Sequence, residues 1–323
     1  MSLPIIFISG PTAIGKSELA LNLAAKTHGE IINADSMQVY EELKILTARP
    51  SDHDQKIVPH HLYGHVPGTY RYNVVEWCNE TISILKKNNQ KKILSIIVGG
   101  TGLYIETLLN GIANIPIISQ EYKEQSNRLL LDLGLKKFYH EVYKIDKTSC
   151  EAISKNDSQR LKRIWEVYYA TGKTLSKWIK NNHKKFFKDY DYYVCLFFPE
   201  REETYKRVNS RFLKMIDNGA IDEVKKLLSL NLDPSLPIMK AHGVPEISQY
   251  LFGSINLEEC ISKGQQVTRN YVKRQISWWK SSNLNNLTIF KHFPSNIDLE
   301  SLDFIKKLTN SLILSYPQPK SLT

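Results

Sequence analysis

The sequence predicts an α/β protein, a parallel β-sheet flanked by helices, into which an α-helical subdomain is inserted. Short, continuously apolar runs are typical of strands that are buried on both faces of a parallel sheet. A segment with helical periodicity lies between the first run and the second. Such runs occur at residues 5–8, 30–34, 92–98 and 192–198. From residue 115 the chain consists of polar helices with tight breaks. We therefore expect a core of residues 1–114 and 190–323, with a helical insertion at 115–189.

The composition is that of an ordinary globular protein. The chain has 323 residues, of which 42% are hydrophobic, enough to bury a core. No apolar run reaches the roughly 20 residues of a membrane-spanning helix, and no basic, apolar leader opens the chain. We expect a cytoplasmic monomer without a membrane partner. The four cysteines have neither zinc nor CxxC spacing, and we interpret them as free thiols.

Positive charge is concentrated in the insertion. The formal net charge is +10, and the stretch 155–188 holds ten Lys or Arg residues against only Asp157 and Glu166. A basic block is most often a solvated face. Aromatic residues interleave with this one, which favours a polyanionic partner such as nucleic acid. They are Trp165, Tyr168, Tyr169, Trp178, Phe186 and Phe187.

The first strand runs into a glycine turn that precedes a helix at 18–24. The turn comprises Gly10, Pro11, Thr12, Ala13, Ile14, Gly15, Lys16 and Ser17. This spacing is that of the phosphate-binding loop (P-loop) of nucleotide-binding proteins, in which backbone N–H groups and a helix N-terminus surround an anion. The lysine neutralises the anion and the hydroxyl reaches Mg²⁺. The alternative is a glycine turn with a surface lysine.

Two further strand ends are expected beside this loop. The second strand ends at Asp35, and ligands of parallel sheets lie beyond the carboxyl ends of strands, so Asp35 should face the same crevice as Lys16. Asp35 could equally serve as a turn residue. The third strand runs into Gly99, Gly100 and Thr101, where many P-loop enzymes carry a Mg²⁺-ordering aspartate. The glycines suit close approach of a ligand, although a plain turn also fits.

Residues 46–72 are expected to form a loop, followed by a helix at 73–88. The loop carries His53, His60, His61 and His65, but no recognisable metal-ligand set is complete, so we favour structural or ligand-adjacent roles.

The insertion should contain helices capped by Ser119 and stopped by Gly134, then a helix at 135–145 and one that opens at 156–159 and ends at 171–173. The apolar stripe of the last one is Leu161, Ile164, Trp165 and Tyr168, which we expect in a core. Gln159, Lys162 and Arg163 lie off this stripe and can reach a partner.

Beyond the fourth strand we expect helices at 202–218, 222–230 and 268–280, a loop at 237–245, a closing helix at 299–314 and a disordered tail at 317–323. The first of these helices carries cations that face either the phosphate crevice or solvent. They are Arg201, Lys206, Arg207, Arg211 and Lys214. The helix at 268–280 stacks cationic and aromatic rows, as nucleic-acid faces do.

Taken in order, these motifs resemble those of the tRNA dimethylallyltransferases, which prenylate an adenosine beside the anticodon. The resemblance covers most of the chain. It rests on the P-loop, residues 35–40, 59–62 and 98–104, residues 156–160 with Arg163, residues 171–173, and residues 268–275 with Trp278. A P-loop alone is weakly specific, whereas the ordered combination of motifs is strongly specific.

The resemblance implies a P-loop that holds the diphosphate of dimethylallyl diphosphate, with Mg²⁺ at Ser17. Lys16 would then neutralise the leaving diphosphate, Asp35 would accept the proton of the adenine amine, and Thr101 would hold the diphosphate or orient the base. It also implies contacts to the tRNA. These would come from Asp35, Ser36, Met37, Gln38, Thr101, Lys123, Gln159, Arg160, Leu161, Lys162, Arg163, Arg269, Lys273 and Arg274.

The chain departs from the family pattern at three positions, Lys123, His242 and Lys280, where arginine, an aliphatic residue and arginine are usual. Three other functions are alternatives: a P-loop kinase or NTPase, a non-catalytic RNA-binding protein, and a prenyltransferase that uses free adenylate. The basic insertion disfavours the last of these, because a mononucleotide acceptor gives no reason for such a charge.

Overall fold

The computed structural model describes residues 3–181, 183–187, 190–282, 284 and 287–296. The chain forms two compact units, Met1–Leu108 with Phe187–Thr323, and Leu109–Phe186. The second unit therefore begins and ends a few residues earlier than the expected insertion at 115–189. Its earlier start reflects a short antiparallel pair, β5 (Ile112–Ala113) with β6 (His183–Lys184), that belongs to it. Strands of two residues leave no recognisable sequence pattern.

The first unit is built on a six-stranded sheet in the order β3-β2-β4-β1-β7-β8, and all its pairings are parallel. Its strands are β1 (Ile5–Ser9), β2 (Glu30–Asn33), β3 (His60–His61), β4 (Ser95–Gly99), β7 (Tyr192–Phe197) and β8 (Leu287–Phe290). The four predicted strands are confirmed as β1, β2, β4 and β7. Because β1 and β4 lie at the centre, every one of their residues is buried.

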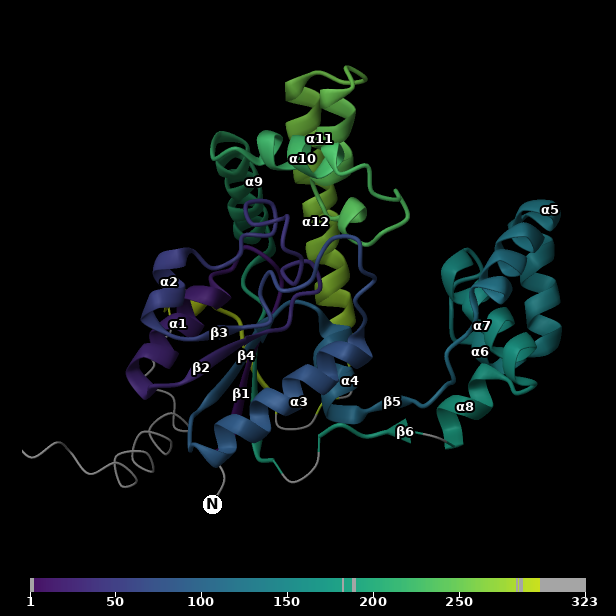
Figure 1. Cartoon of the computed structure of the whole chain (residues 1–323), viewed down its shortest axis with the longest axis horizontal. Helices are drawn as coiled ribbons and strands as arrows, with labels where there is room; N and C mark the ends of the chain where they lie inside the picture. Colours follow the sequence, from purple (N-terminus) through teal and green to yellow (C-terminus); the bar gives the residue numbers. More distant parts are fainter. Residues whose placement is uncertain (1–2, 182, 188–189, 283, 285–286, 297–323) are drawn as a thin grey trace, which may run out of the picture. The chain divides into compact units, whose positions relative to one another are not determined.

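Helices cover this sheet and extend beyond it (Figure 1). They are α1 (Lys16–Thr27), α2 (Asp52–Ile57), α3 (Val74–Gln90), α4 (Gly102–Asn110), α9 (Arg201–Asp217), α10 (Ala220–Ser229), α11 (Val244–Leu251) and α12 (Leu257–Ser281), with 3₁₀ turns η1 (Ile238–Lys240) and η2 (Pro294–Asn296). One apolar core lies between α1 and the sheet. A second joins α9, α10 and α11 to the segment that follows β2. That segment is thereby held against α9–α12, at the end of the unit where the site lies.

The second unit is a helical bundle. Its helices are α5 (Gln120–Ile145), α6 (Lys147–Glu151), α7 (Ser158–Thr171) and α8 (Leu175–Asn181). Gly134, at φ 69° and ψ 161°, breaks α5 where the sequence predicted a stop. Leu161, Ile164 and Trp165 are buried in the core of this unit, as predicted, whereas Tyr168 is only partly buried. Ser119 precedes α5 as predicted, but its side chain makes no capping hydrogen bond.

Several elements differ from the sequence prediction. Helix α12 begins eleven residues before the expected position at 268, at a capping box formed by Asn256 and Glu259. Helix α2, inside the expected loop, begins at a second capping box formed by Ser51 and Asp54. The predicted closing helix at 299–314 and tail at 317–323 lie outside the described residues.

The four cysteines are buried, and none of them forms a disulfide bond within the described residues, which agrees with their interpretation as thiols. In the described part of the chain, no helix combines the length and apolarity needed to cross a membrane.

Candidate functional site

The P-loop connects β1 to α1 and requires glycine at its first position. A Cβ at Gly10, whose φ is 142°, would lie 2.5 Å from the carbonyl oxygen of Phe197. Gly15, at φ 94°, precedes α1, and no side chain caps the helix there. The first N–H groups of an uncapped helix, together with the helix dipole, favour an anion. The loop therefore has the backbone geometry of an anion site.

Two cationic side chains donate hydrogen bonds to this loop. The ammonium group of Lys16 donates to the carbonyl of Pro11 at 2.6 Å. Burial lowers the pKa of Lys16 to about 7, an effect that Asp35 opposes and that nearby Arg211 reinforces. Arg211 reaches the loop from α9 and donates to the hydroxyl of Thr12. Arg211 thus links α9 to the P-loop. Lys206, Arg207 and Lys214 of the same helix line, with Arg211 and Ala13, a groove next to the loop.

Asp35 follows β2. It is both a turn residue and a residue of the P-loop crevice, the two roles that the sequence suggested for it. Its Oδ1 accepts the backbone N–H of Met37 at 2.9 Å, which makes it a turn residue. Its own N–H donates to the side chain of Asn33 at 2.8 Å. It also lines the P-loop cavity together with Lys16. The turn fixes one carboxylate oxygen, and within the described residues no hydrogen bond is made by the other.

The glycine pair after β4 lets neighbouring backbones approach closely. A Cβ at Gly99 would lie 2.1 Å from the carbonyl oxygen of Ala34, and one at Gly100 would lie 2.1 Å from Nε2 of Gln275. Thr101 then joins this segment to the Asp35 turn, because its Oγ1 accepts the N–H of Ser36 at 3.1 Å. The two predicted strand ends therefore meet.

Gln275 of α12 was not predicted to have a role of its own. It is 4% exposed. Its side chain accepts the N–H of Thr12 at 2.9 Å and donates to the carbonyl of Gly100 at 3.0 Å. It thereby ties the P-loop to the glycine pair. In the sequence Gln275 is a polar residue at helical spacing from Val272 and Trp279, and this pattern does not reveal which partners its side chain has.

Two cavities meet at this site. The P-loop cavity, of about 290 Å³, is lined by residues 12–17, by Asp35 and Gln38, and by Gly99 and Gly100. The adjoining cavity, of about 190 Å³, is lined by residues that follow β2, by α9 and by α12. Thr12, Asp35, Thr47 and Arg211 line both. A group bound at the P-loop and a group bound in the adjoining cavity would therefore face each other across Asp35.

The adjoining cavity combines apolar and aromatic walls. Met37, Leu46, Val208, Phe212 and Met215 form its apolar part, and Lys240, His242, Thr268 and Tyr271 its polar part. The rings of His242 and Tyr271 lie 4.6 Å apart. Burial, and secondarily Arg274, lowers the pKa of His242, so the imidazole is neutral at neutral pH. Burial raises the pKa of Tyr271.

The remaining predicted contacts in the first unit are distributed differently. Gln38 lines the P-loop cavity and donates to the carbonyls of Thr47 and Ala48 at 2.8 and 3.1 Å. Arg269 is engaged within the fold, donating to Asn209 of α9 at 2.7 Å. Lys273 and Arg274 are exposed on α12.

In the second unit the predicted residues lie at the starts of α5 and α7. Lys123, Gln159 and Arg160 are exposed, and Lys162 donates to Asn127 of α5 at 2.6 Å. Burial lowers the pKa of Arg163, which lies near Glu166. Leu161 is fully buried in the apolar core. Its side chain is therefore not part of the surface on which its neighbours lie.

The oxygen atoms around the P-loop cavity suit Mg²⁺, a hard cation that usually keeps several waters and is shared with substrate phosphates. Ser17 and Asp35 both line that cavity. Among the described residues no group of three or more His, Cys, Asp or Glu side chains forms a metal-binding cluster. The hydroxyl of Ser17 and the carboxylate of Asp35 are oxygen donors, and this donor set fits Mg²⁺.

Known protein families match nearly the whole chain. A model described as IPP transferase matches residues 38–282, and one described as isopentenyl transferase matches residues 3–59. The tRNA dimethylallyltransferase of Wolbachia pipientis wMel is 43% identical over 94% of this chain and 97% of its own. That of Agrobacterium fabrum is 40% identical over 85% of this chain and 93% of its own.

Solved structures agree with these matches. A tRNA isopentenylpyrophosphate transferase from Bacillus halodurans superposes with a TM-score of 0.65 at 28% identity, covering 97% of this chain and 95% of its own. A eukaryotic dimethylallyltransferase acting on tRNA superposes with a TM-score of 0.78 at 25% identity, covering 99% of this chain and 82% of its own.

Proposed function

The chain belongs to the IPP transferase family, and we propose that it is a tRNA dimethylallyltransferase. It transfers the dimethylallyl group of dimethylallyl diphosphate to N6 of the adenosine on the 3′ side of the anticodon and releases diphosphate. The observation that carries this proposal is the shared wall of the two cavities, where Asp35 lies beside an anion-binding loop. That arrangement suits a donor with an anionic leaving group and an acceptor that must lose a proton.

The P-loop stabilises the leaving group. As the allylic C–O bond breaks, negative charge grows on the diphosphate. The N–H groups of the loop would neutralise it together with Lys16 and Arg211, which line the cavity. Groups that are fixed in place before charge develops give the largest electrostatic contribution to catalysis. Mg²⁺ at Ser17, shared with the diphosphate, would supply further charge neutralisation there.

Asp35 is the base for the acceptor. The lone pair of the adenine amine forms the new N–C bond to the allylic carbon, and the amine proton passes to the carboxylate. The hydrogen bond from Met37 to Oδ1 orients the carboxylate, and a positioned base of this kind typically contributes about 10²–10⁴-fold to the rate. Thr101, bonded to the neighbouring Ser36, holds this turn in place.

The acceptor adenine has to leave its stack to enter the adjoining cavity, which fits recognition of a splayed anticodon loop. Exposed cations of the second unit, together with Lys273 and Arg274 of α12, bind the RNA backbone. The tRNA acceptor supports a cytoplasmic location.

The test is an assay of the purified protein with labelled dimethylallyl diphosphate and total tRNA, followed by digestion and nucleoside analysis. We expect the label in one N6-modified adenosine. A P-loop kinase or NTPase would instead bind ATP and turn it over to ADP, with no labelled nucleoside. Transfer to free adenylate at the rate seen with tRNA would identify a prenyltransferase that uses free adenylate.

A further inference from the structure

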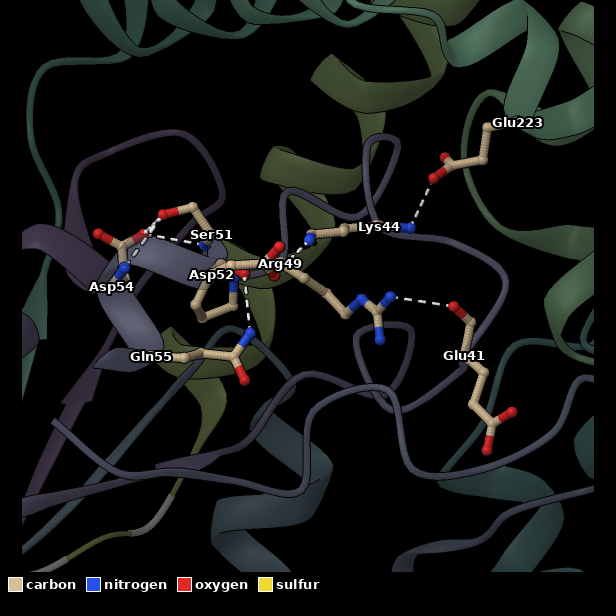
Figure 2. A network of polar contacts seen from close by, with 9 residues as sticks. Glu41, Lys44, Arg49, Ser51, Asp52, Asp54, Gln55 and Glu223 are labelled. Carbon is tan, nitrogen blue, oxygen red and sulfur yellow. Dashed lines mark hydrogen bonds and ion pairs between the residues drawn. The ribbon is translucent and has the colours of Figure 1, made fainter. Parts of the chain in front are cut away.

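A carboxylate outside the two cavities holds one of their walls. Glu223, in the first turn of α10, accepts three consecutive backbone N–H groups. They belong to Lys44 at 2.6 Å, Ile45 at 2.7 Å and Leu46 at 2.9 Å. Figure 2 shows the carboxylate reaching the backbone of Lys44, while the side chain of that lysine points to Asp52. Glu223 therefore binds the loop itself and not a side chain of it.

The loop of residues 44–48, here called the 44–48 loop, is also held at its other end. The side-chain amide of Gln38 donates to the carbonyls of Thr47 and Ala48. Leu46 packs so tightly on Gly243 that a Cβ there would lie 2.8 Å from its side chain. Ala48 has a φ of 52°, a conformation that L-residues rarely adopt and that persists only when the surroundings impose it.

This loop forms a wall of the site. Thr47 lines both cavities, Leu46 lines the adjoining cavity, and Ala48 lines the P-loop cavity. The loop also positions Gln38, which lines the P-loop cavity. A shift of the loop would therefore change the space between the bound diphosphate and the acceptor.

We propose that Glu223 is a positioning residue for the transfer reaction, acting through the 44–48 loop on the wall that the two cavities share. This inference rests on the proposed function. Three amides directed at one carboxylate are satisfied only by acceptor oxygens, because an N–H or NH₂ group in the same place would repel them. Misplacement of reacting groups by about 1 Å can cost about 10²-fold in rate.

The test compares Glu223→Gln with two matched controls. The substitution keeps the size of the side chain and replaces one acceptor oxygen by an NH₂ donor. Asp222→Asn removes the same charge from the adjacent, exposed position of α10. Asp52→Asn removes the surface ion pair between Lys44 and Asp52 and leaves the sequence of the 44–48 loop unchanged. For each variant, kcat and KM for dimethylallyl diphosphate and tRNA are measured, together with residue-resolved hydrogen exchange and thermal unfolding.

We expect Glu223→Gln to lower kcat about tenfold or more and to speed exchange at the amides of residues 44–46, while the amides of β1 and β4 stay protected. Both controls should behave as wild type. Unchanged kcat in a variant with faster exchange in the loop would overturn the proposal, and so would unchanged exchange.

If Glu223→Gln unfolds, the double variant Glu223→Gln/Gln38→Met is compared at lower temperature with each single variant. If the fold-loss of kcat in the double variant equals the product of the two single fold-losses, a shared action on one loop is contradicted. Wild-type protein that transfers nothing to tRNA would refute the proposed function, while the exchange measurement would still report on the loop.

Discussion

Lys16 has a pKa that burial brings close to neutral pH, so its charge state should respond to a ligand. Burial is the main cause that lowers its pKa to about 7, so without a ligand the ammonium group is largely neutral above that pH. A bound diphosphate places negative charge beside it and favours the charged form. Ligand binding should therefore raise the pKa of Lys16 and draw a proton from solution.

We predict that binding of dimethylallyl diphosphate at pH 8, without tRNA, takes up about one proton per site. Titration calorimetry in buffers with different ionisation enthalpies measures this number. At pH 6, below the pKa of about 7, Lys16 is already charged and the uptake should disappear. The exposed lysine of the same helix is the control, and Lys26→Met should leave the uptake at pH 8 unchanged. Binding at pH 8 without proton uptake would contradict this prediction, because it would mean that the ligand does not change the charge state of Lys16.

The role of Asp35 as a base separates from its role in the turn. Asparagine can still accept the N–H of Met37 but cannot take up a proton. Asp35→Asn should therefore lower kcat about 10²–10⁴-fold and leave tRNA affinity and thermal stability close to wild type. Asp35→Ala should also lose transfer, with additional disorder of the turn. Asparagine and wild-type proteins with the same single-turnover rate would dismiss Asp35 as the base.

At the scale of elements, one buried side chain of α12 joins two loops of the sheet. Gln275→Leu, similar in volume, would leave the N–H of Thr12 and the carbonyl of Gly100 without their present partner. An unpaired buried polar group costs about 1–3 kcal/mol, so the free energy of unfolding should fall by at least that amount. The affinity for dimethylallyl diphosphate should fall with it, because the P-loop loses an anchor.

Urea denaturation and equilibrium titration measure the two effects. Ser277→Ala, at an exposed position of α12, serves as the control. A loss of stability without any loss of affinity would mean that Gln275 supports the fold but not the shape of the P-loop.

The sequence predicted elements where the signal is local. Continuous apolar runs located β1, β2, β4 and β7, and the glycine spacing located the P-loop. Helices α2 and α12 begin at capping boxes, Ser51 with Asp54 and Asn256 with Glu259, which the sequence contained and which the prediction missed. By contrast, β5 and β6 have two residues each, and such pairs depend on a partner that is distant in sequence.

The same distinction applies to the candidate site. Residues adjacent to strand ends, such as Asp35 and Thr101, were found because parallel strands bring their carboxyl ends together. Arg211 was one of five cations on its helix, and only the three-dimensional structure distinguishes it by its bond to Thr12. Leu161 was included by resemblance, and its burial shows that a motif can contain core residues beside surface ones.

At the scale of the whole molecule, the first unit contains the anion site, and the second unit carries the basic residues that we expect to contact tRNA. We predict that the triple variant Arg160→Gln, Lys162→Gln and Arg163→Gln weakens tRNA binding and lowers the salt dependence of its Kd. Each lost phosphate contact reduces the slope of log Kd against log salt by about one. The affinity for dimethylallyl diphosphate should not change, because its site is lined by the first unit alone.

The matched control removes three exposed charges from the end of α3, as Lys86→Gln, Lys87→Gln and Lys91→Gln. Fluorescence anisotropy at several salt concentrations compares the two triple variants. Equal losses of tRNA affinity in both would point to overall charge and not to the surface of α7.

The central claim is that the P-loop of this chain binds the leaving group of a carbon donor. It is tested most directly with dimethylallyl diphosphate that carries one label in its carbon chain and another in its diphosphate. After reaction with tRNA, we predict that the carbon label is found in an N6-modified adenosine and the phosphorus label in free diphosphate, in equal amounts. Phosphorus label in the RNA, or turnover of ATP without transfer of the carbon label, would contradict the claim.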